Sequence, residues 1–215
     1  MNEQCEYEYL DGRPYITSHH PGFFVLPCDA DESDRMVILH FFIKFAFNGN
    51  FVSPIVQSLR MTQRINVKAD RPKVLDIGCG AGTWILEMGS EYPSADFHGI
   101  DIRTMFPSTI KPPNTHFTKY NFFKNLPYQD NTFVFIRMQL VLLFATQSEL
   151  LHLLSEIYRT LKPGGYFELL DCEYQIHRPG PLSDNLINHT CKFYCSNGIY
   201  EYICIFNICI SSPSL

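Results

Sequence analysis

Residues 74–82 read Val-Leu-Asp-Ile-Gly-Cys-Gly-Ala-Gly, and this run carries most of the chemistry that the sequence offers. Val74, Leu75 and Ile77 predict a buried parallel strand. The three glycines after it leave a tight turn without side chains, where a nucleotide-like ligand can lie against the backbone as the next helix begins. Asp101, which ends the next apolar run, can accept hydrogen bonds from both hydroxyls of a ribose.

The spacing of the glycines distinguishes between two classes of ligand. A dinucleotide fingerprint, G-x-G-x-x-G, places its glycines close to a pyrophosphate. Here Thr83 stands where the third glycine would be, and the glycine comes one residue earlier, at Gly82. Asp76 adds negative charge before the turn, which would repel a pyrophosphate and favour a cation. S-adenosylmethionine carries an ammonium, a sulfonium and a ribose, so it is the predicted cofactor, and a nicotinamide dehydrogenase is the disfavoured alternative.

Composition limits the class of protein. The chain has 215 residues, of which 46% are hydrophobic and 18% charged, with a net charge of −5. These values fit one globular domain with a full core and a small appendage rather than a disordered chain. Because the charge is negative and no basic run stands out, nucleic acid is an unlikely partner.

The chain start and the cysteines bear on the compartment. The acidic start is not a signal peptide, and the sequence holds no apolar stretch long enough to span a bilayer. We therefore expect a cytoplasmic protein, with a nuclear location as the alternative, no membrane partner, and eight reduced cysteines. The pairs Cys191/Cys195 and Cys204/Cys209 lack C-x-x-C spacing, so no metal site is predicted.

The elements that must position the turn begin with a front section. Residues 1–32 look irregular because glycine and proline punctuate them. Ser33 predicts the cap of a helix over residues 34–47, which is apolar nearly all round and should therefore be buried on several sides. Ser53-Pro54 predicts the start of a second helix that continues to Met61. This section, residues 1–69, is interpreted as a helical lid.

From Lys73 onward, strands alternate with helices. Helices are predicted over residues 83–92 and 146–161, and the second carries a capping box of Thr146 and Glu149 before it ends at Lys162-Pro163-Gly164-Gly165. The predicted strands are 73–77, 96–100, 115–119, 133–137 and 166–171. Such alternation predicts an α/β fold, with a mostly parallel sheet covered by helices on both faces.

Four runs, in this order and spacing, match a known family. They are Val-Leu-Asp-Ile-Gly-Cys-Gly-Ala-Gly-Thr (74–83), His-Gly-Ile-Asp-Ile (98–102), Asn-Leu-Pro-Tyr-Gln-Asp-Asn-Thr-Phe (125–133) and Glu-Ile-Tyr-Arg-Thr-Leu-Lys-Pro-Gly-Gly-Tyr-Phe (156–167). Through them the chain resembles class I S-adenosylmethionine-dependent methyltransferases, and its front section resembles methyltransferase-domain proteins abundant in fungi. The resemblance implies a Rossmann-like, doubly wound sheet of order 3-2-1-4-5 and a cofactor-binding domain over residues 70–180.

The same resemblance implies roles for individual residues. Gly78, Cys79 and Gly80 would line the methionine part of the cofactor, with Asp76 near its amino group. Asp101 would hold the ribose and Ile102 would pack on the adenine. Asn121 and Phe122 lie where the family places a polar residue at the adenine amine. Met138 would face the methyl-transfer pocket. Tyr15, from the front section, could close over the cofactor.

The end of the chain departs from the family pattern. The family sheet normally ends with a sixth strand and an antiparallel seventh after another helix. Here residues 181–196 could supply a helix, but residues 199–210 offer a single strand-like run. We therefore expect incomplete last strands, an atypical tail over residues 181–215, a C-terminally truncated chain, and an exposed sheet edge or apolar patch that favours aggregation.

These expectations predict methyl transfer from S-adenosylmethionine to an unidentified small-molecule or protein acceptor. The sequence identifies no catalytic residue, and Cys79 is interpreted as a small turn residue because nothing supplies a base for thiol catalysis. Arg137 could anchor an acidic substrate or form a structural salt bridge. The alternative function is a non-catalytic binding or regulatory module, or an inactive truncated product.

Overall fold

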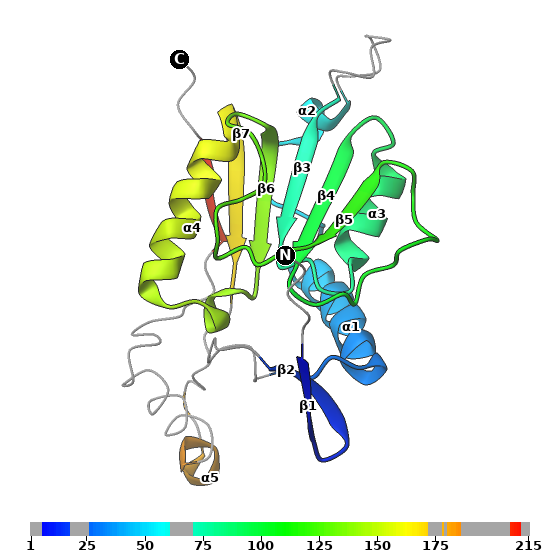
Figure 1. Cartoon of the computed structure of the whole chain (residues 1–215). Coiled ribbons are helices and arrows are strands. Elements are labelled where there is room, and N and C mark those ends of the chain that lie inside the picture. The colour runs from blue at the N-terminus through cyan, green and yellow to red at the C-terminus, as the bar shows by residue number, and fades with distance from the viewer. Residues whose placement is uncertain are drawn as a thin grey trace.

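The computed structural model describes residues 6–17, 26–60, 71–171, 178, 180–185 and 207–211, and its centre is a six-stranded sheet in the order β5-β4-β3-β6-β7-β8 (Figure 1). Neighbours from β5 to β7 run parallel, and β8 joins β7 antiparallel at the edge. This is the predicted order 3-2-1-4-5 with one added strand, so the predicted fold is confirmed. The strands are β3 (Lys73–Ile77), β4 (Asp96–Asp101), β5 (Thr115–Lys119), β6 (Phe133–Gln139), β7 (Leu161–Leu170) and β8 (Asn207–Ser211).

Helices cover both faces of the sheet through two hydrophobic clusters. Leu153 and Ile157 of α4 (Gln147–Thr160) belong to the larger cluster, which packs on one face. Trp84 of α3 (Thr83–Glu91) and Leu59 of α2 (Val56–Arg60) belong to the cluster on the other face. The smaller helices are η4 (Leu142–Phe144) and α5 (Pro181–Ser183).

The best-marked helix of the sequence forms as predicted. In α4 the Thr146 backbone N–H donates to Glu149 at 2.9 Å and the Glu149 N–H donates to the Thr146 hydroxyl at 3.4 Å, which is a capping box. The next strand begins earlier than predicted. Leu161 already pairs with Phe133, and the predicted turn at residues 162–165 is a register irregularity inside β7.

The front section corrects two predictions. Residues 6–17 are not irregular but form an antiparallel hairpin of β1 (Glu6–Leu10) and β2 (Arg13–Thr17). Its turn, Asp11-Gly12, has positive φ at both residues (50° and 79°), as a type I′ turn requires. Helix α1 (Ala30–Phe47) begins earlier than predicted because Asp29, rather than Ser33, caps it by accepting the Glu32 N–H at 2.9 Å.

The expectation that this helix is buried on several sides is wrong. Only Glu32 and His40 are buried in α1, whereas Ile38, Phe42 and Phe45 are 70%, 65% and 86% exposed. Figure 1 shows α1 and the hairpin beyond the carboxyl ends of the parallel strands, so α1 covers the end of the sheet with one side. That side carries Met36, Leu39 and His40, which line a cavity at the end of the sheet.

Some predictions fall outside the described residues. These are the front residues 18–25, the continuation of the second helix to Met61, residues 186–196 of the C-terminal helix and residues 199–206 of the strand-like run. Within the described residues, no helix is long and apolar enough to cross a membrane.

Candidate cofactor-binding site

The turn after β3 requires glycine for two physical reasons. Gly78, Gly80 and Gly82 all have positive φ, at 73°, 54° and 77°, where side chains are strained. A Cβ on Gly78 would lie 2.6 Å from Val141 Cγ2, and one on Gly80 would lie 2.8 Å from Met36 Sδ. Bare backbone is therefore what lets neighbouring elements, and a ligand, approach this turn closely.

Asp101 at the end of β4 holds the turn in place. Its Oδ2 accepts the Gly80 N–H at 2.8 Å and its Oδ1 accepts the Arg103 N–H at 2.8 Å. The Gly78 and Cys79 N–H groups both donate to the Ile100 carbonyl, at 2.9 and 3.1 Å. Each carboxylate oxygen keeps acceptor capacity beyond these bonds, so Asp101 can both shape the turn and receive hydroxyl groups.

Asp76 is one member of a buried ion pair. Arg137 on the adjacent strand is its register partner and donates from Nη1 to Asp76 Oδ1 at 2.9 Å. The guanidinium also lies 4.7 Å from the ring centroid of Trp84. Burial raises the pKa of Asp76, against the opposing attraction of Arg137. Contrary to the expectation from sequence, Asp76 does not present an unopposed negative charge, and Arg137 forms a structural salt bridge with it.

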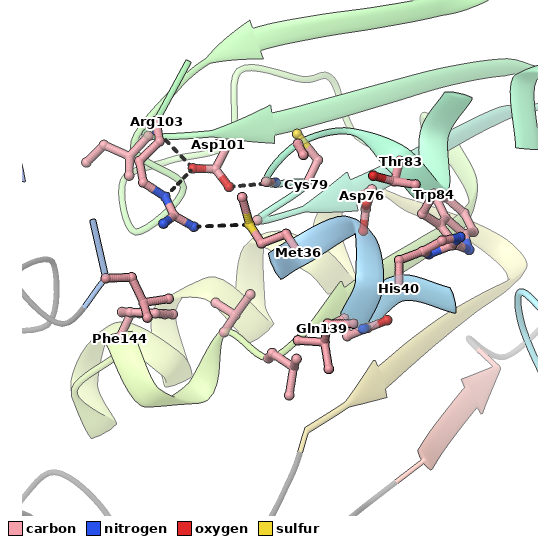
Figure 2. A pocket seen from close by; sticks show the side chains of 18 of the residues that line it. Met36, His40, Asp76, Cys79, Thr83, Trp84, Asp101, Arg103, Gln139 and Phe144 are labelled. Atoms are coloured by element: carbon pink, nitrogen blue, oxygen red, sulfur yellow. Dashed lines mark hydrogen bonds and ion pairs between the residues drawn. The ribbon is translucent and has the colours of Figure 1, made fainter. Parts of the chain in front are cut away.

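A cavity of about 990 Å³, counted with its open mouth, lies beside the turn. Figure 2 shows Asp101 and Arg103 at one end, His40 and Trp84 at the other, and Met36 between them. Most of the residues predicted from sequence line this cavity: Asp76, Gly78, Cys79, Gly80, Asp101, Ile102 and Phe122. The structure thus brings these residues together around one space.

Three of the residues singled out from sequence lie elsewhere. Met138 is fully buried in the larger core cluster, because alternate residues of a strand point to opposite faces and its neighbours Arg137 and Gln139 take the cavity side. Asn121 is not among the lining residues, and its Oδ1 accepts the Phe123 N–H at 3.1 Å. Tyr15 does not line the cavity either, although Ile16 beside it does.

The front helix supplies lining residues that sequence reasoning missed. Met36, Leu39 and His40 of α1 line the cavity, and Arg103 reaches Met36 Sδ at 3.9 Å and Glu32 at 3.9 Å. Part of the signal was present in the sequence, because His40 interrupts the apolar run of residues 36–43. Which element that side would face depends on tertiary packing.

Cys79 behaves as a small turn residue. It is buried, and burial raises the pKa of its thiol well above the ordinary value. A Cβ on Gly99 would lie 2.9 Å from its sulfur, so the side chain fills the space between the turn and β4. A thiol kept neutral in this way is a poor nucleophile.

Comparison with known proteins gives the family. Residues 74–165 match the family described as "Methyltransferase domain". The "Secondary metabolism regulator LAE1" of Cochliobolus heterostrophus is 33% identical over 109 residues, which cover 51% of this chain and 33% of that protein. The "Protein-methionine methyltransferase laeA" of Emericella nidulans is 26% identical over 183 residues, covering 81% of this chain and 43% of that protein. The chain thus spans about a third to two fifths of the length of these relatives.

A solved structure agrees in fold. Haemonchus contortus phosphoethanolamine N-methyltransferase 2, in complex with S-adenosyl-L-methionine, superposes with a TM-score of 0.51 and 20% identity, covering 88% of this chain and 43% of that one. At this identity the likeness concerns the fold alone. Residues 74–165 of the chain therefore match the methyltransferase domain family, and the sheet around them has the Rossmann-like class I fold.

Proposed function

We propose that the chain binds S-adenosylmethionine in this cavity and transfers its methyl group to an acceptor. The observation that supports the proposal most is the glycine turn bound to Asp101, Gly80 N–H to Oδ2 at 2.8 Å, on the wall of an open cavity. A Cβ at Gly78 or Gly80 would clash with Val141 or Met36, so the turn must be bare backbone for these two cavity-lining residues to lie where they do.

The lining residues fit the parts of this cofactor. Asp101 would accept hydrogen bonds from the ribose hydroxyls, and Ile102 and Phe122 supply apolar surface for the adenine. Asp76 would face the ammonium and its partner Arg137 the carboxylate of the amino-acid end. When bound, the cofactor supplies a methyl group on a sulfonium, which is already an activated leaving group.

The chain's own work is then alignment and exclusion of water. Helix α1 closes over the turn, because Met36 lies within van der Waals reach of the Gly80 backbone. Holding donor and acceptor in line can supply up to roughly 7–11 kcal/mol of the barrier in the best intramolecular cases. The acceptor is a small molecule or a protein, and the name of the Emericella nidulans relative makes a methionine thioether one acceptor to test.

Isothermal titration of the purified chain with S-adenosylhomocysteine tests the proposal. We expect saturable binding to one site and no heat from NAD⁺ under the same conditions. Binding of NAD⁺ in place of S-adenosylhomocysteine would remove the proposal. Binding of S-adenosylhomocysteine without methyl transfer to any acceptor would instead support a non-catalytic binding module.

A further inference from the structure

A histidine on the front helix is held by a carboxylate. His40 of α1 is 8% exposed, and its Nε2 lies 2.8 Å from Glu87 Oε2 on α3. Lys44 also bonds Glu87. Burial raises the pKa of Glu87, but the bonds from Lys44 and His40 outweigh it, so the net shift is downward. An ionised carboxylate only accepts hydrogen bonds, so the proton of the neutral ring is on Nε2 and Nδ1 is left with its lone pair.

This histidine stands where two cavities meet. His40 lines the large cavity together with Asp76 and Gly80. It also lines a smaller adjoining cavity of about 320 Å³, counted with its open mouth. The residues shared by both linings are His40, Trp84, Arg137 and Gln139, and Figure 2 shows His40, Trp84 and Gln139 near one another at the same end of the large cavity.

The adjoining cavity contains acceptors that lack donors. Among the described residues, Gln139 Oε1 and Asn50 Oδ1 are buried side-chain oxygens with no hydrogen-bond partner, and both residues line this cavity. A buried acceptor without a donor is costly, by roughly 1–3 kcal/mol. A ligand group that brought an N–H or O–H donor to either oxygen would offset this cost.

We infer that His40 is the general base of the methyl transfer, and that the acceptor is an oxygen or nitrogen nucleophile that carries a proton and enters through the adjoining cavity. This inference rests on the proposed function. The acceptor atom forms a bond to the methyl carbon, the carbon–sulfur bond breaks with its electron pair on sulfur, and His40 Nδ1 takes the acceptor's proton. Glu87 is a positioning residue that fixes the ring. A thioether has no proton to lose, so it needs no base.

The charges around His40 cancel in pairs. Glu87 of α3 is paired with Lys44 of α1, and Asp76 of β3 is paired with Arg137 of β6. Each charge near the ring therefore already has a partner of opposite sign. We expect the rate to rise with pH, because a general base must be unprotonated to accept a proton.

The test uses the full chain with tritium-labelled S-adenosylmethionine and a protein and metabolite extract of Emericella nidulans. The variants are His40→Gln and Glu87→Gln, with His152→Gln as control because His152 is an exposed residue of α4. Loss of a general base lowers kcat by ~10²–10⁴-fold. We expect such a loss in His40→Gln, together with loss of the rise of the rate with pH, and no change in His152→Gln. Mass spectrometry should locate the methyl group on oxygen or nitrogen.

Two readouts do not depend on turnover. Isothermal titration with S-adenosylhomocysteine should give dissociation constants within about threefold of wild type for His40→Gln, since a lost base does not remove cofactor binding. In ¹⁵N-histidine spectra, His40 should carry its proton on Nε2 and not on Nδ1, and Glu87→Gln should disturb this preference.

Several results would overturn the inference. One is a methylsulfonium product, and another is a rate in His40→Gln that still rises with pH as in the wild type. A third is a His40 ring that carries its proton on Nδ1 instead of Nε2. The fourth is a wild-type chain that binds S-adenosylhomocysteine but transfers no methyl group. Failure of the wild-type chain to bind S-adenosylhomocysteine at all is a different result, because it removes the proposed function itself.

Discussion

Asp101 is the residue on which cofactor affinity is expected to depend most. It bonds two backbone N–H groups of the turn region and is proposed to accept ribose hydroxyls as well. Asp101→Ala should therefore weaken S-adenosylhomocysteine binding by ~1–3 kcal/mol, because buried donors lose their acceptor. Isothermal titration measures the change. Asp130→Ala is the control, since that carboxylate is 68% exposed and pairs with Arg159; unchanged affinity in Asp101→Ala would refute the ribose assignment.

Two glycines with nearly the same φ allow the cost of backbone strain to be distinguished from the cost of a steric clash. Gly78 and Gly164 have φ of 73° and 76°, but a Cβ on Gly78 meets Val141 at 2.6 Å, whereas one on Gly164 meets no atom of the described residues within 4 Å. Gly164→Ala should cost the left-handed backbone penalty of ~1–2 kcal/mol. Gly78→Ala should cost more, since it adds the clash. Urea denaturation of both variants checks this, and equal losses would contradict the steric reading of the turn.

Gln139 is expected to lower the stability of the fold while it contributes to binding of the acceptor. Its Oε1 is buried and has no hydrogen-bond partner among the residues that the structure describes. Gln139→Met, which keeps the approximate shape and removes the polar atom, should therefore raise the free energy of unfolding by about 1 kcal/mol. The same variant should raise the KM for a protic acceptor. A variant that is less stable in urea than the wild type would indicate that the amide has a partner in solution.

Among the elements, those marked by local signals could be predicted and those set by packing could not. Helix α4 was predictable because Thr146 and Glu149 form its cap from adjacent positions. Helix α1 was predicted, but its start was placed too late. Asp29 and Ser33 are both good N-cap residues, and only the hydrogen bond from the Glu32 N–H to Asp29 shows which of them caps the helix. The hairpin before it was missed although Asp11-Gly12 is its turn signal.

The exposed face of α1 gives a prediction at the scale of the element. Ile38, Phe41, Phe42 and Phe45 are exposed and recur at helical spacing. Phe42→Lys combined with Phe45→Lys should leave the urea midpoint unchanged and lower self-association. Light scattering over a concentration series measures this. Leu151→Lys on α4, an exposed leucine of the same size class, is the control, and unfolding of the double variant would show that the face is covered.

At the scale of the molecule, the sequence was enough for the parallel sheet but not for its site. The alternation of strands and helices predicted a mostly parallel sheet, and the family resemblance supplied the order of its strands. The pairing of Asp76 with Arg137 depends on the register of two strands far apart in sequence, and the approach of His40 to Glu87 depends on how α1 lies on α3. Such contacts are tertiary, and no local signal gives them.

The pH dependence of stability is a property of the whole fold to which one partly buried histidine contributes. His98 on β4 stacks on His116 at 4.9 Å between ring centroids, and its Nε2 is buried without a partner among the described residues. Burial, reinforced by the charge of His116, lowers the pKa of His98 to about 4 from 6.5. Between these values only the unfolded chain binds the proton, so stability is complete above about pH 6.5 and is lost as the pH falls toward 4.

The expected loss is large enough to measure. From about pH 7 to about pH 5, the proton on unfolded His98 should lower the free energy of unfolding by about 2 kcal/mol. His98→Phe removes the group, so its loss over this interval should be smaller than that of the wild type by this amount, in urea denaturation at both pH values. His152→Gln, which alters an exposed histidine, should keep the wild-type dependence. If His98→Phe and wild type lose stability equally on acidification, the ring is not held neutral by the core, and the acid sensitivity of the fold must come from its paired carboxylates.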